Sequence, residues 1–186
     1  TFVMILKYAL KKIQSCNDIE LVKDIVNSVN DNQIKNKKWL VKHLKPYLDM
    51  YTDSKIVVAA GWHGLSAHII NKDVISFDMD PRTKQVKLFP NVKYKLSKIE
   101  EFDPSSFDII ICTSCEHITD NVINDFIKKK KGTALVVLQS NDYFEIEDHI
   151  NCKNNCEEFA DSINMRILET HTLKLKKYNR FMLFGV

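Results

Sequence analysis

The chain has 186 residues, of which 45% are hydrophobic and 27% are charged, as in an ordinary globular protein with a sizeable core. A net charge of +3 at pH 7 is too small to indicate nucleic-acid binding by itself. Every apolar run is shorter than a membrane span, so membrane association is not indicated either.

The five cysteines are an odd number, and Cys112 lies within an apolar run. This usage suits free thiols in a reducing compartment better than a disulfide framework, so a cytoplasmic location is expected. Two spacings are compatible with metal ligands: Cys112-x-x-Cys115-x-His117 and His149-x-x-Cys152-x-x-x-Cys156. Zinc needs about four ligands in a tetrahedron, whereas Cys112 and Cys115 sit at a predicted strand end, with side chains expected to point in opposite directions. We therefore expect no metal site.

Three helices are predicted before the first strand, over residues 2–14, from the cap Asn17-Asp18 to about residue 29, and over about residues 33–48. The lysines of the third helix are expected to form a solvated face: Lys35, Lys37, Lys38, Lys42 and Lys45. We expect residues 1–50 to be a helical extension that packs on a core domain of residues 51–186.

Residues 55–70 have the pattern of a buried strand, a glycine turn and a helix. The apolar first half ends at Gly61, and the helical pattern begins at Gly64. These two glycines allow the backbone to turn tightly and to approach a ligand closely. The free N–H groups at the start of the helix favour electron-rich groups of a ligand.

A second apolar run, residues 74–81, ends in two acidic residues. Asp78 is placed to accept hydrogen bonds from both hydroxyls of a ribose, because it follows the glycine turn by the spacing found in nucleotide-binding units. Asp80 is the second candidate. Asp80-Pro81 also has the pattern of a helix cap followed by proline at the first helical position.

The rest of the chain continues the alternation of helices and strands. A short helix (81–89) precedes strands at 92–96 and 107–114, a helix from Thr119 or Asp120 to 128–131, a strand at 133–138, a polar loop (139–152), a helix at 156–162, and strands at 165–175 and 180–185. This order indicates an α/β fold with a doubly wound, mainly parallel sheet.

The order strand, glycine turn, helix, strand, Asp-x-Asp-Pro resembles the class I S-adenosylmethionine-dependent methyltransferases, from about residue 35 to the C-terminus. The resemblance implies a Rossmann-like, seven-stranded sheet closed by a C-terminal antiparallel pair, and S-adenosylmethionine as the cofactor. Two motifs depart from the family. Gly61-Trp62-His63-Gly64 stands in place of Gly-x-Gly-x-Gly, and the acid that commonly follows the third strand is absent, leaving Ser97. The predicted cofactor-binding residues are Gly61, Trp62, His63, Gly64, Asp78, Ser97 and Ser114.

Two polar clusters follow the fourth and fifth strands, which are otherwise apolar, and buried polar groups must be paired or used. We expect both strands to lie next to the first strand, so that the clusters border the glycine turn. In the first cluster, Glu116 is interpreted as a substrate-binding acid and His117 as a nearby general base; the alternative is that they cap the following helix and pack against the loop. The remaining substrate-binding candidates are Gln139, Asn141, Tyr143 and His149, with Asn151 beside His149 on a loop that reaches over the cleft as a lid.

The predicted function is methyl transfer to an unidentified small or medium substrate. S-adenosylmethionine is already activated, so this reaction requires mainly in-line alignment, and it requires a base only when the nucleophile must lose a proton. Two alternatives stay open: transfer of the cofactor's aminocarboxypropyl group, and a non-catalytic binding or structural protein with the same fold. The sequence does not predict the oligomeric state.

Overall fold

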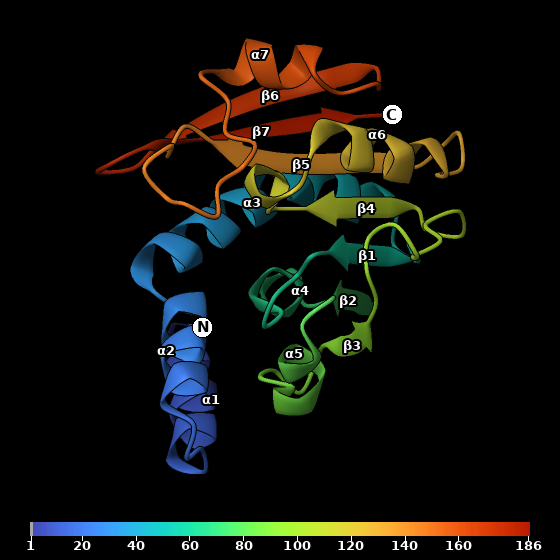
Figure 1. The fold of residues 1–186 in the computed structure, drawn as a ribbon. Coiled ribbons are helices and arrows are strands. Elements are labelled where there is room, and N and C mark those ends of the chain that lie inside the picture. Colours follow the sequence, from blue (N-terminus) through green and yellow to red (C-terminus); the bar gives the residue numbers. More distant parts are fainter. Residues whose placement is uncertain (1) are drawn as a thin grey trace.

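A seven-stranded sheet in the order β3-β2-β1-β4-β5-β7-β6 forms the centre of the computed structural model, which describes residues 2–186 (Figure 1). β7 runs antiparallel to both of its neighbours, and the other pairs are parallel. The strands are β1 (Ile56–Ala59), β2 (Val74–Asp78), β3 (Lys93–Leu96), β4 (Ile109–Cys112), β5 (Leu135–Asn141), β6 (Ile167–Lys174) and β7 (Asn179–Gly185). The predicted α/β fold and its closing antiparallel pair are confirmed.

Five of the helices begin at polar residues whose side chains accept backbone N–H groups of the first turn. Asp18 caps α2, Asn30 caps α3, Asp80 caps α5, Thr119 caps α6 and Asn155 caps α7. The helices are α1 (Phe2–Gln14), α2 (Ile19–Ser28), α3 (Asp31–Met50), α4 (Leu65–Ile70), α5 (Pro81–Val86), α6 (Asp120–Lys128) and α7 (Cys156–Asp161), with a 3₁₀ helix, η1 (Cys115–His117), after β4.

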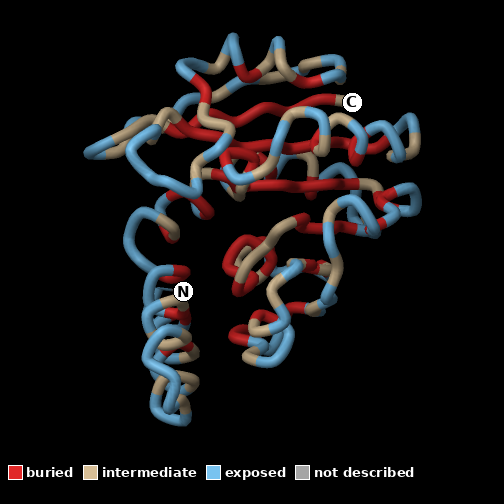
Figure 2. The backbone as a smooth tube through the Cα atoms, in the orientation of Figure 1, coloured by how far each residue is buried: buried red, intermediate tan, exposed pale blue. Residues whose placement is uncertain are grey.

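Alternate side chains of the strands pack into two separate layers. Ile56 and Val58 of β1 face α1–α4, whereas Val57 and Ala59 face α6 and α7. Figure 1 shows α3 and α6 on opposite sides of the sheet, and Figure 2 shows the central strands buried between them. The central strands are therefore apolar on both faces, which explains their continuous hydrophobic runs.

The N-terminal helices share the core of the sheet. Ile5 of α1 and Ile25 of α2 are almost wholly buried and belong to the same hydrophobic cluster as Val58. The ring of Tyr8 meets those of His68 and Phe89 edge to face. The pair α1–α2 is thus fixed beside the β1–β3 half of the sheet (Figure 1). None of the described helices is long and apolar enough to cross a membrane.

Two details of the sequence prediction are wrong. β4 lies next to β1 as expected, but β5 pairs with β4 and β7 and does not touch β1. The side chains of Cys112 and Cys115 do not diverge; both pack in the layer beneath α6, because the chain coils into η1 directly after β4. All five cysteines are free thiols.

Candidate functional site

The turn after β1 is built by close backbone packing. The Gly61 N–H donates to Phe77 O at 2.9 Å, and a Cβ on Gly61 would overlap the Ser76 hydroxyl. Gly64 has φ +84°, and a Cβ there would lie 2.8 Å from the Tyr94 hydroxyl. Both glycines are therefore required by the geometry of the turn.

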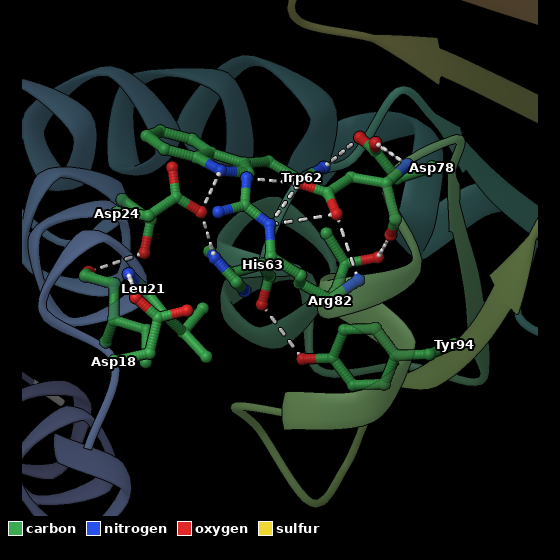
Figure 3. A network of polar contacts seen from close by, with 12 residues as sticks. Asp18, Leu21, Asp24, Trp62, His63, Asp78, Arg82 and Tyr94 are labelled. Atoms are coloured by element: carbon green, nitrogen blue, oxygen red, sulfur yellow. Dashed lines mark hydrogen bonds and ion pairs between the residues drawn. The ribbon is translucent and has the colours of Figure 1, made fainter. Parts of the chain in front are cut away.

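Asp78 lies at the tip of β2, against this turn (Figure 3). Its carboxylate accepts the N–H of Trp62 at 2.8 Å and that of Asp80 at 3.0 Å. Asp80 is used differently: it caps α5 and forms an ion pair with Arg82, which holds the pKa of the Asp80 carboxyl below its usual value. Asp78 is thus oriented by backbone groups and, unlike Asp80, forms no ion pair within the described chain.

The Trp62 and His63 side chains turn toward α2 (Figure 3). Asp24 Oδ2 lies 3.1 Å from Trp62 Nε1 and 2.6 Å from His63 Nε2. The His63 side chain is fully buried, and within residues 2–186 its Nδ1 has no hydrogen-bond partner. Asp24 therefore ties the glycine turn to the N-terminal helices.

A cavity of about 260 Å³ opens beside Asp78 at the carboxyl ends of β1–β3. Most of its wall is apolar, and Ser97 and Glu100 add polar groups. The lining residues are Ala60, Phe77, Asp78, Met79, Ser97, Ile99, Glu100, His117, Ile118, Thr119, Val122 and Ile150.

A second, more polar cavity of about 70 Å³ adjoins it, with Ala60 and His117 common to both. Of the predicted residues, Gly61, Trp62, His63, Ser114 and Glu116 border this smaller space. Lys37 and Arg180 also line it. The structure therefore brings Glu116 and His117 to the same space as the glycine turn.

Glu116 does not cap the following helix, since Thr119 does so. Its Oε1 accepts a hydrogen bond from Arg180 Nη1 at 3.1 Å, and Arg180 Nη2 donates to Thr113 O at 2.7 Å. Both charged side chains are buried. Within the described part of the chain, Glu116 Oε2 is buried with no partner, and a buried polar atom of this kind usually has a use.

Lys37 is buried rather than solvated, which corrects the prediction for the third helix. The pKa of Lys37 is lowered to about 7, chiefly by burial and in part by the charge of Arg180. When the Asn36 amide oxygen faces these cations, it lies 3.1 Å from Lys37 Nζ and 3.1 Å from Arg180 Nε. The amide nitrogen then lies 2.8 Å from Gln139 Oε1. A buried polar network thus extends behind Glu116.

The other predicted substrate residues lie around this network or on the loop after β5. Gln139 and Asn141 are buried and line neither cavity. Tyr143 stacks on Tyr178, with ring centroids 4.8 Å apart. The His149 ring meets His117 edge to face at 4.8 Å. Of the four, His149 therefore contacts His117 of the predicted catalytic pair.

A larger hollow lies at the opposite end of the strands. It measures about 510 Å³ and opens at the amino ends of the strands, among Lys55, Lys72, Asp73 and Lys93. Open α/β sheets bind ligands at the carboxyl ends of their strands. We therefore place the candidate site at the smaller cavities beside Asp78 and Glu116.

No protein-family model matches the chain, and no curated protein matches it in sequence. Solved structures do match. Magnesium protoporphyrin IX methyltransferase (ChlM) from Synechocystis PCC 6803, with bound SAM, has a TM-score of 0.61 at 12% identity over 96% of this chain and 89% of that one. N-methyltransferase NodS from Bradyrhizobium japonicum WM9 has a TM-score of 0.57 at 11% identity, over 83% and 97%. Coclaurine N-methyltransferase, with N-methylheliamine and SAH, has a TM-score of 0.56 at 12% identity over 74% of this chain, which spans 52% of that protein.

The chain has the fold of the class I S-adenosylmethionine-dependent methyltransferases.

The glycine turn of this chain has an unusual backbone. Ala60, Trp62 and Gly64 all have left-handed backbone conformations, with φ of +48°, +49° and +84°. These positions have the every-second-residue spacing of Gly-x-Gly-x-Gly. Residues other than glycine are strained in this conformation. Trp62 is held there by hydrogen bonds to Asp78 and Asp24.

Sequence reasoning missed four residues of this candidate site: Asp24, Lys37, Glu100 and Arg180. Arg180 had a visible signal, as a lone charge that begins an apolar run. Glu100 also had one, because it follows β3 by four residues and offers an acid near the place where the family commonly has one. Asp24 and Lys37 had none, since each lies on a helix among other charged residues that are exposed, such as Lys23 and Lys38.

Proposed function

We propose that this chain is a methyltransferase that binds S-adenosylmethionine at the ends of β1–β3 and holds a small or medium acceptor beside Glu116 and His117. The observation that carries the proposal is the Asp78 carboxylate. It lies at the tip of β2 on the wall of the 260 Å³ cavity and is oriented by two backbone N–H groups. A carboxylate at this position is suited to accept hydrogen bonds from both ribose hydroxyls.

The residues around Asp78 fit the nucleoside half of the cofactor. Met79, Ile99 and Ile118 supply apolar walls for a flat ring, and Ser97 and Glu100 supply polar groups for its edge. The cavity is slightly smaller than a typical ligand pocket, which measures about 300–1,000 Å³. It is therefore matched to the nucleoside, and the adjoining polar cavity extends it toward Glu116.

When bound, S-adenosylmethionine supplies a methyl group on a positively charged sulfur. The residues of this chain need mainly to align the acceptor with that methyl group. His117 lines both cavities, so it is placed at their junction. Arg180 fixes the Glu116 carboxylate through Oε1 and leaves Oε2 for an acceptor group. In this proposal Gln139 and Asn141 support the site from behind, while Tyr143 and His149 border it from the loop.

Calorimetric titration with S-adenosylhomocysteine tests cofactor binding. We expect Asp78→Ala to weaken binding by about 1–3 kcal/mol, because hydrogen bonds to a charged group are lost. Asp73→Ala is the matched control, since the Asp73 carboxylate is exposed and pairs with Lys93 away from the cavity; it should bind like the unmutated chain. Failure of the unmutated chain to bind at millimolar ligand would favour the non-catalytic alternative.

Product analysis separates methyl transfer from the other transferase reaction. S-adenosylhomocysteine as the product supports our proposal, whereas methylthioadenosine indicates transfer of the aminocarboxypropyl group.

A further inference from the structure

We infer that Glu116, His117 and His149 bind a divalent transition-metal ion. A carboxylate oxygen of Glu116 and one ring nitrogen from each histidine lie within 4.8 Å of one another. Two imidazoles and one carboxylate are a common donor set for first-row divalent metals and leave coordination positions open. The sequence predicted no metal, because neither cysteine–histidine spacing gathers four ligands. The fold instead takes one histidine from each spacing, adds Glu116, and leaves the cysteines out.

The two histidines are held in the tautomer that metal binding requires. His117 Nδ1 lies 2.9 Å from Asp148 O, and His149 Nδ1 lies 2.8 Å from Tyr143 O. Because a carbonyl oxygen only accepts, each Nδ1 carries the proton of its neutral ring and Nε2 keeps its lone pair. A hydrogen bond from the second nitrogen to a backbone carbonyl is the usual support of a metal-binding histidine.

Glu116 supplies the second, independent observation. Its side chain is buried, Arg180 occupies Oε1, and Oε2 has no partner among the described residues. Leaving a charged, buried oxygen unpaired is costly, and a cation offers the missing partner. The positive charge of Arg180 opposes a second cation, so we expect weaker binding than in a closed structural zinc site.

The loop that carries His149 is fastened over η1. The Asn151 N–H donates to Glu116 O at 2.9 Å, and Asn151 Nδ2 donates to Ile118 O at 2.7 Å. Three ligands of one metal with bonds of about 2.1 Å lie about 3.0–3.6 Å from one another. Ligand atoms that are now as much as 4.8 Å apart therefore need to close by about 1.2–1.8 Å, which side-chain rotation can supply while the fastened loop keeps the three residues together.

The role of this metal rests on the proposed function. His117 lines the space next to the proposed methyl group, so the open positions of the metal would hold an oxygen-bearing group of the acceptor. In that case Glu116 and His117 act as ligands rather than as acid and base.

Metal binding is tested without cofactor, by calorimetry with Mn²⁺, Co²⁺ and Zn²⁺ on chelator-treated protein and by the visible absorption of the Co²⁺ form. We expect one ion per chain, with affinity at least tenfold lower in His117→Ala and in His149→Ala. His68→Ala is the matched control, because the His68 side chain contacts Asn91, Tyr8 and Phe89 in a different part of the fold; it should bind metal normally. Circular dichroism confirms that each variant is folded.

Absence of binding to the unmutated chain at millimolar metal would overturn the inference, as would full binding by the His117→Ala/His149→Ala double variant. Cofactor titration of the same samples keeps the two proposals apart. Metal binding without S-adenosylhomocysteine binding would support the metal site and refute the proposed function. Binding of S-adenosylhomocysteine without metal binding would support the proposed function and refute the metal site.

Discussion

Gly61 and Ser76 face each other across the first two strands, at a contact that only glycine allows. A Cβ at residue 61 would overlap the Ser76 hydroxyl and lie 3.2 Å from Val58 Cγ1. We expect Gly61→Ala to destabilise the fold by about 1–3 kcal/mol, as overpacking of a closed core does. Chemical denaturation measures this loss.

Removing the Ser76 hydroxyl from the Gly61→Ala variant should restore most of the lost stability, which a double-mutant cycle can measure. The Ser76 hydroxyl has no partner among the described residues, so Ser76→Ala alone should be nearly neutral. Gly132→Ala is the control for the glycine change, because its new Cβ meets nothing within 4 Å. If Gly61→Ala is as harmful with Ser76→Ala as without it, the overlap is not the cause.

Lys37 makes stability depend on pH in the alkaline range. Its pKa is lowered from 10.5 to about 7 in the folded state, chiefly by burial. Between these values the unfolded chain holds a proton that the folded chain has released. Stability therefore rises with pH from about 7 to 10.5, by at most about 1.4 kcal/mol per pH unit. Below pH 7 both states are protonated, and the contribution is constant.

Unfolding free energies of the unmutated chain and Lys37→Met at pH 7.5 and 9.5 test this dependence. Between these pH values the unfolding free energy should rise more steeply for the unmutated chain and for the control than for Lys37→Met. Lys38→Met is the control, since the neighbouring lysine is exposed. Equal pH slopes in all three proteins would contradict the account.

At the scale of elements, Asp24 joins α2 to the turn after β1. Its carboxylate accepts hydrogen bonds from the Trp62 indole and from buried His63. Asp24→Ala should cost about 1–3 kcal/mol, because a buried donor loses its partner. Amide protection in α1 and α2 should also fall, which hydrogen exchange measures.

Glu20→Ala is the matched change on the same helix. Its ion pair with Lys23 is exposed on both sides, so its loss should leave stability within about 0.5 kcal/mol. Equal effects of the two substitutions would mean that the contact with the turn does not hold α2 in place.

The elements were predictable because each rests on local chemistry. The caps at Asp18, Asp80 and Thr119 and the apolar runs of the central strands all have direct sequence signals. The start of α3 was placed two residues late, because Asn30 caps this helix rather than ending the previous one. Element boundaries were thus less certain than element types.

At the scale of the whole molecule, the strand alternation predicted the sheet, and the strand ends predicted that Glu116 and His117 lie beside the glycine turn. The partners of the site residues were not predictable. Arg180 reaches Glu116 from β7, and Lys37 reaches the same cavity from α3. These contacts join residues far apart in sequence through strand order and helix packing, which no local pattern encodes. Lys37 in particular has the same local surroundings as the exposed lysines beside it.

A crystal structure with S-adenosylhomocysteine would show where the cofactor binds. We expect the ribose hydroxyls at the Asp78 carboxylate, the adenine between Met79, Ile99 and Ile118, and the sulfur directed toward Glu116 and His117. A ligand seated in the hollow at the amino ends of the strands, among Lys55 and Lys72, would contradict this placement.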